Sequence, residues 1–260
     1  MATAAAPCEL MGFELVTLRV PLVDGPLDDS VWAEVDETSL PIETRRRLAA
    51  NGIRAGIFGA RLPTKLDELL KPVESQAAED GSTAIQVSDF ENEQPVRRRV
   101  IQTRSGRKMK FICMGERTRV PELSLLMRSD DGSVRGRTYA HVMGLLLARA
   151  FPQGDGRVRL DIVPEVEHGE QQRRFVPGDG MMRVEFGPAH DQFDELEIEA
   201  ELSPGQTLLL TSLPGREGTL GHHFFAEHSD RAMQKLFLVR LVTTNYDDRF
   251  STAAPAAELD

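Results

Sequence analysis

Acidic and apolar residues alternate strictly from Glu195 to Leu202, with a glutamate at every odd position. Successive side chains of a β-strand point to opposite faces, so this pattern predicts a strand with one buried face and one acidic face. We interpret the acidic face as one that meets water or a basic partner and resists unwanted edge-to-edge pairing, rather than as a catalytic pair of carboxylates. A turn signal at Pro204-Gly205 and a leucine run from Thr207 onward predict that a second strand follows directly.

Strand-like segments recur at roughly even spacing through the last two-thirds of the chain, and turn signals separate them. They cover residues 83–90, 97–105, 107–115, 122–142, 156–169, 182–186, 195–202, 206–213 and 235–243. We predict hairpins at Ser105-Gly106 and at Asp131-Gly132. The apolar run Ala140–Phe151 fits a buried helix or a strand, and we favour a strand because turn signals bound it on both sides. Such a series favours a sandwich or a curved antiparallel sheet.

The first third of the chain alternates strand and helix signals instead. Strands are expected at Phe13–Leu22 and at 53–60, with helices at 28–37, 41–52 and 62–73. This order predicts two strands covered by helices on one face, with Trp32 as an anchor of the core. The fold class is therefore α+β: a leader at 1–12, a small α/β module at 13–75, a linker within 73–83, a β domain at 84–247 and a disordered tail at 248–260.

Composition excludes several classes of protein. The formal net charge of −10 gives nucleic acid and anionic membrane surfaces no general reason to attract the chain. The basic segment Val96–Lys110 is interpreted as the solvated face of a hairpin, because no aromatic residues interleave with its charges. No apolar run reaches the ~18 to 20 residues that a membrane-spanning helix requires.

Two cysteines cannot form a disulfide framework. Cys113 lies in an apolar run and is expected to be a buried thiol. Cys8 lies in a leader of small residues, which fits a plain disordered terminus better than a cysteine that carries a lipid after processing.

The segment 221–228 contains His222, His223 and His228, with Glu227 and Asp230 nearby. Adjacent histidines on a strand point to opposite faces, so we expect no metal here, but a loop whose Phe224 and Phe225 plug a core. His168 and His190 are explained by turn positions. The chain has no nucleophile elbow, phosphate loop or dinucleotide fingerprint, so we predict neither enzymatic activity nor a cofactor.

Two segments of the last two-fifths of the chain resemble the C-terminal domain of the secretin family, the outer-membrane ring proteins of type II and type III secretion and of type IV pili. The first is a strand whose matching residues are Val158, Leu160, Ile162, Pro164 and Val166. The second is a turn and strand with Gly205, Gln206, Thr207, Leu208 and Leu210, followed by the apolar strand Leu236–Leu241. In place of the family's membrane-lip hairpin the chain has only the short segment 216–225, so the resemblance does not extend to the residues that insert into the membrane and form the pore.

The resemblance implies a non-enzymatic protein of the bacterial cell envelope, periplasmic or associated with the outer membrane. It would act by assembling with itself or with other secretion or pilus proteins, with neither nucleic acid nor a direct membrane span involved. The residues expected to hold the assembly fold are Val158, Leu160, Pro164, Gly205, Gln206, Thr207 and Leu208. The alternative is a soluble β-sandwich binding module that uses the loop His222–His228 for a ligand or a metal.

Overall fold

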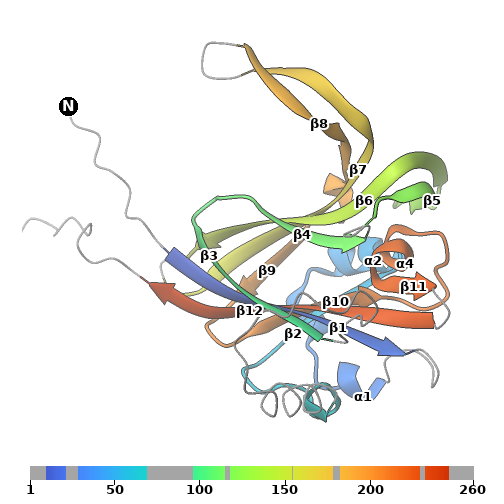
Figure 1. Cartoon of the computed structure of the whole chain (residues 1–260). Helices are drawn as coiled ribbons and strands as arrows, with labels where there is room; N and C mark the ends of the chain where they lie inside the picture. Colours follow the sequence, from blue (N-terminus) through green and yellow to red (C-terminus); the bar gives the residue numbers. More distant parts are fainter. Residues whose placement is uncertain are drawn as a thin grey trace, which may run out of the picture.

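Two mainly antiparallel sheets pack face to face and form the body of the protein (Figure 1). The computed structural model describes residues 10–21, 29–68, 96–114, 118–153, 155–177, 182–228 and 232–245. Over these ranges the chain is mostly antiparallel β, which confirms that part of the predicted fold class. The expected linker at 73–83, the strand at 83–90 and the tail at 248–260 lie outside the described residues.

The first sheet combines strands from both ends of the chain, in the order β2-β10-β12-β1-β3, with β11 pairing a further part of β12. Its strands are β1 (Leu10–Pro21), β2 (Ile53–Phe58), β3 (Val96–Arg104), β10 (Thr207–Ser212), β11 (Ala226–His228) and β12 (Ala232–Asn245).

The second sheet is built from the middle of the chain, in the order β4-β6-β7-β8, with β5 also on β6 and β9 also on β7. Its strands are β4 (Met109–Met114), β5 (Val120–Arg128), β6 (Val134–Pro152), β7 (Val158–Pro177), β8 (Met182–Gln192) and β9 (Ile198–Leu202).

Short helices close the ends and one outer face of this sandwich. They are α1 (Asp29–Trp32), α2 (Ile42–Ala50), α4 (Leu220–Phe225), one turn at residues 64–68, and the 3-10 turns η2 (Glu37–Ser39) and η3 (Asp194–Leu196).

The N-terminal α/β layer differs from the prediction. Strands β1 and β2 form close to where they were expected, but β10 and β12 lie between them. β1 pairs along its whole length with β12, and β2 pairs with β10, because the leucine-rich runs of β10 and β12 are buried and give each N-terminal strand an apolar partner. Leu10 to Gly12, which were expected to belong to a disordered leader, are part of β1.

The hairpin predicted at Ser105-Gly106 is wrong. β3 pairs with β1 in the first sheet, whereas β4 pairs with β6 in the second. Gly106 has φ +70° and its amide donates to Ala150 O at 2.9 Å, so this corner carries the chain from one sheet to the other. The hairpin at Asp131-Gly132 is confirmed, because β5 and β6 pair on either side of it.

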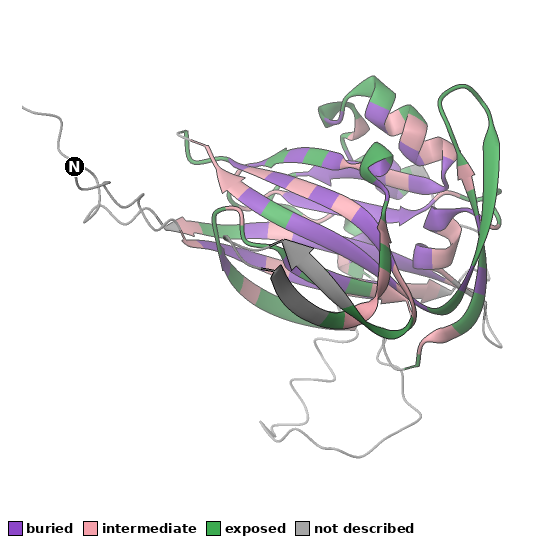
Figure 2. Ribbon diagram, turned by 90° about the horizontal axis from the view of Figure 1, so that it is seen from above, coloured by how far each residue is buried: buried purple, intermediate pink, exposed green. Residues whose placement is uncertain are grey.

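The run Ala140–Phe151 is a strand, as favoured. It belongs to the 19-residue β6, and Leu146, Ala148 and Ala150 point into the core between the sheets. Figure 2 shows buried and exposed positions alternating along the strands, with the buried ones concentrated in the middle of the body.

A second, smaller core lies on the other face of the first sheet. Trp32 is 6% exposed there and packs with Leu66 of the turn 64–68 and with Leu209 of β10, which confirms its expected role as a core anchor. The guanidinium of Arg54 lies 4.0 Å above the indole ring and is itself bound to Glu37 at 2.9 Å.

β6 and β7 of the second sheet separate after the residue pair Met143 and Glu167. We call this point the fork. Beyond the fork, β6 continues only with β5, and β7 continues only with β8. Each strand pair forms a two-stranded extension, and the β7–β8 extension projects from the body in Figure 1.

Candidate functional site

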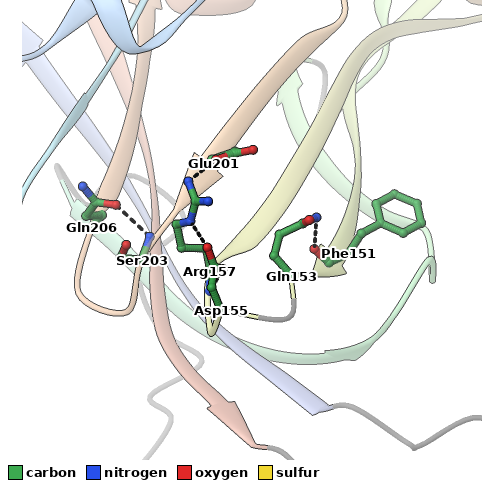
Figure 3. Close-up of polar contacts among 7 residues, drawn as sticks. All are labelled: Phe151, Gln153, Asp155, Arg157, Glu201, Ser203 and Gln206. Atoms are coloured by element: carbon green, nitrogen blue, oxygen red, sulfur yellow. Dashed lines mark hydrogen bonds and ion pairs between the residues drawn. The ribbon is translucent and has the colours of Figure 1, made fainter.

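The Gly205 turn joins the two sheets. Gly205 has φ +89°, a conformation that a residue with a side chain rarely adopts. Gln206 N donates to Ser203 O at 2.9 Å, and Gln206 Oε1 accepts from Ser203 N at 2.7 Å, as drawn in Figure 3. The amide of Gly205 donates to Leu241 O at 2.7 Å, so the turn is also bonded to β12.

Thr207 and Leu208 follow this turn at the start of β10, between β2 and β12. Thr207 is 3% exposed and Leu208 is fully buried in the core between the sheets. Val158 and Leu160 of β7 enter the same core from the second sheet, where they pair with β9. The predicted motif residues therefore meet across the sandwich, but their buried side chains do not form a contact surface.

Pro164 lies at a break in the pairing of β7. Its carbonyl accepts from Phe193 N at 3.0 Å, at the junction where η3 separates β8 from β9. In an antiparallel strand the N and C=O groups of one residue point to the same edge, so the missing N–H of Pro164 points to this junction and not to β6. The proline therefore does not disrupt the pairing with β6.

The histidine loop is a short helix rather than the strand-like loop that was expected. α4 places Phe224 and Phe225 in the core at 0% and 1% exposure, which confirms that they plug it. His223 Nε2 lies 3.1 Å from Ser124 O, and His222 Nδ1 accepts from Gly218 N at 3.4 Å. Within the described ranges no three metal-ligating side chains come together, whereas the side chains of residues 227–230 lie outside them, so the loop stays untested as a metal site.

Three further predicted positions gain a physical setting. Cys113, expected to be buried, is partly buried against the core between the sheets, and desolvation raises the pKa of its thiol to about 12. His168 and His190 lie in strands β7 and β8 rather than in turns, because β7 and β8 remain paired past the fork on both sides of a bulge that begins at His168.

A polar cluster that the sequence did not reveal holds β6 to β8 at the fork. Tyr139 is 5% exposed and donates to Asp191 Oδ2 at 2.9 Å, while Arg137 forms an ion pair with the same carboxylate. The ring of His168 packs 4.9 Å from the tyrosine ring. Burial, together with the hydrogen bond to Asp191, raises the pKa of Tyr139 to about 12, so the phenol keeps its proton and remains a donor. No local motif indicates this cluster, because its members come from three strands.

Beyond that cluster the β7–β8 extension is a ribbon of two strands. Residues 172–177 pair with 182–187 after a bulge that begins at His168. Gly169 has φ +73° within the bulge. Phe186 is 66% exposed on this ribbon, with the Arg173 guanidinium 5.1 Å from its ring. An isolated two-stranded ribbon is at best marginally stable in water, so such a projection is suited to contact with another surface.

No protein-family model matches the chain, and no curated protein does. Secretins are among its structural neighbours. The type II secretin GspD of enteropathogenic Escherichia coli matches at a TM-score of 0.27 and 12% identity, over 94% of this chain and 71% of that one. The secretin domain of InvG, from the Salmonella SPI-1 injectisome, matches at a TM-score of 0.25 and 14% identity, over 97% of this chain and 66% of that one. These are distant similarities, and no functional argument rests on them.

Among the described residues, no helix has the length and apolar character to cross a bilayer.

Proposed function

We propose that this chain is a non-enzymatic, secretin-like protein of the bacterial cell envelope that acts by assembly. It would contact copies of itself, or other envelope proteins of a secretion or pilus apparatus. The observation that carries the proposal is the β7–β8 extension, in which a pair of strands leaves the body and presents Phe186 at 66% exposure. The sequence motif around Gly205 supports the envelope assignment, and its buried residues supply a rigid base for the extension.

The Tyr139–Asp191 bond explains how such a base can be rigid. It ties β8 to β6 immediately below the bulge, at a buried position where a hydrogen bond to a charged group contributes roughly 1.5–3 kcal/mol. The extension therefore leaves the body in a fixed direction. A contact surface held in this way loses less conformational entropy when a partner binds than a free loop would.

The experiment is to shorten the extension and to measure the molar mass. Gln172 pairs with Gly187, so Arg173 to Phe186 can be replaced by an Asn-Gly turn that closes the same hairpin. Size-exclusion chromatography with light scattering should show multimers for the wild type and monomers for the shortened variant. Circular dichroism and the unfolding temperature should stay close to those of the wild type, because the described residues that build both cores lie outside the removed segment.

A point variant serves as the milder test. Phe186→Ser keeps the length of the ribbon and removes only the exposed ring. It should weaken assembly without changing the fold. A wild-type chain that remains monomeric at every concentration, with or without envelope extract, would overturn the proposed function, and a shortened variant that assembles normally would exclude the extension as the contact.

A further inference from the structure

One lateral edge of the first sheet is strongly basic. β3 pairs with β1 along one side, and no described strand pairs with its other side. β3 carries Arg97, Arg98, Arg99 and Arg104 and no acidic residue, and Arg98 forms an ion pair with Glu14 of the neighbouring β1. Arg98, Arg99 and Arg104 are exposed, and Val100 between them is 67% exposed.

One lateral edge of the second sheet is strongly acidic. β9 pairs with β7 on one side, and within the described residues no strand pairs with its other side. β9 carries Glu199 and Glu201 and no basic residue, and Asp194 and Glu195 of η3 precede it in the chain. Glu195, Glu199 and Glu201 are exposed.

The acidic edge is only partly neutralised by its own neighbours. Arg157 forms ion pairs with Glu201 and with Asp155, as Figure 3 shows. Glu199, in contrast, pairs across the strands with Asp161, another acid. Desolvation raises the pKa of Glu197 above its usual range, and the charges of Asp161 and Glu199 raise it further, while Arg149 acts in the opposite direction. Asp161 itself forms an ion pair with Arg159.

The connections of the chain place the two edges on opposite sides of the sandwich. The corner at Gly106 joins β3 to β4 on one side, and the Gly205 turn joins β9 to β10 on the other. The basic edge therefore cannot neutralise the acidic edge within one molecule. Two copies also cannot join through the same edge, because like charges would face each other.

We propose that copies of this chain join head to tail, with the basic edge of β3 on one copy against the acidic edge of β9 on the next. This inference rests on the proposed assembly function and adds to the β7–β8 extension a second contact surface, so that assembly requires both. Unpaired backbone groups of both edges can extend the sheets across the contact, and the opposite charges set the partner and the orientation. Such a contact is heterologous, so repeated copies close into a ring or run on as a filament.

The decisive experiment reverses the charge of each edge separately and then mixes the variants. Arg98→Glu, Arg99→Glu and Arg104→Glu leave β3 with three acids and one base, so both edges of this variant are acidic. Glu199→Lys with Glu201→Lys leaves β9 with two bases and no acid, so both edges of the other variant are basic. All five substitutions change exposed side chains. In light scattering at low salt each variant alone should be monomeric, because its edges repel, while an equimolar mixture should recover multimers of wild-type mass with the two variants alternating.

The possible outcomes of the light-scattering experiment distinguish the β3–β9 contact from assembly through the β7–β8 extension. Multimers in the mixture alone support the proposal, and a wild-type assembly that falls apart between roughly 50 mM and 1 M NaCl agrees with its electrostatic part. Variants that assemble alone as well as the wild type overturn this contact surface while leaving assembly through the β7–β8 extension intact. Monomeric variants that stay monomeric when mixed overturn the pairing of β3 with β9, and a monomeric wild type overturns both this inference and the proposed function.

Discussion

Gly221 lies directly against the backbone of Gly52, so closely that a side-chain carbon at position 221 would stand 2.0 Å from Gly52 O. The amide of Gly221 donates to Asn51 O at 2.9 Å, and Asn51 in turn bonds to both backbone groups of Arg128. The glycine contact thus places α4 against the end of α2 and, through Asn51, against β5. Without it the two phenylalanines of α4 could not reach the core.

Gly221→Ala is therefore expected to destabilise the protein. Alanine favours helices over glycine by about 1 kcal/mol, but the contact with Gly52 forces α4 to shift, at a cost of roughly 1–3 kcal/mol or more. Urea unfolding monitored by circular dichroism measures the net change in the free energy of unfolding. Gly59→Ala is the control, because nothing lies within 4 Å of a side-chain carbon there. Equal stability of the two variants would contradict the packing of α4.

Gly205→Val should abolish folding or assembly without touching any active site. Valine at φ +89° costs about 1–3 kcal/mol in backbone strain, and its Cβ would lie 3.2 Å from Ala60 Cβ. Thermal unfolding and light scattering of the variant provide the measurement. Gly132→Val is the matched control. Gly132 has φ +80°, so valine there suffers the same backbone strain, but no atom lies within 4 Å of its Cβ. A soluble variant that assembles normally would show that the turn is dispensable.

Phe224→Ala should cost about 3–5 kcal/mol of unfolding free energy, because it leaves a cavity in the core between the sheets. The ring packs on the bare backbone of Gly144, where a side-chain carbon would meet it at 2.6 Å. Phe186→Ala removes the same ring from a position 66% exposed and should change the unfolding free energy by less than about 0.5 kcal/mol. Similar losses in the two variants would contradict the assigned burial.

His141→Gly is expected to raise stability by about 1 kcal/mol. His141 has φ +52°, the left-handed conformation that disfavours a side chain, at the point where β6 changes partner from β5 to β4 and β7. Ala140→Gly, one residue away in ordinary strand conformation, should lower stability instead. Opposite signs in denaturant unfolding would support the strained backbone, and a loss in both would argue against it.

The ionisation of Glu197 should make the stability of the folded protein fall as the pH rises. Its pKa in the folded chain is raised, first by burial and then by Asp161 and Glu199, so the folded state holds this proton more tightly than the unfolded chain does. Stability is therefore lost as the pH rises from the ordinary glutamate pKa through the raised value, and the loss persists at neutral pH. Glu197→Gln should raise the unfolding temperature at pH 7 and leave it nearly unchanged at pH 3. Glu195→Gln, on an exposed neighbour, is the control, and a stabilisation equal to that of Glu197→Gln would refute the local field.

The sequence by itself determined the local structure of most of the chain. Period-two alternation predicted the strand β9, although the start of the alternating run folds as the 3-10 turn η3, and the leucine run predicted β10. Pro204-Gly205 marked the turn between β9 and β10, and Asp131-Gly132 marked a true hairpin. It also identified Trp32 and the two phenylalanines of α4 as core residues. These features follow from short-range geometry and burial, which a few neighbouring residues encode.

Only the tertiary structure decided which strands became neighbours. The same turn chemistry occurs at Ser105-Gly106 and at Asp131-Gly132. Ser105-Gly106 is nevertheless a corner between the sheets, because β3 pairs with β1 from the N-terminal end of the chain, whereas Asp131-Gly132 is a hairpin. The Tyr139–Asp191 bond and the opposite placement of the basic and acidic edges depend on the same long-range pairing. Strand pairing is a competition among all apolar strands for burial, and no local segment carries its outcome.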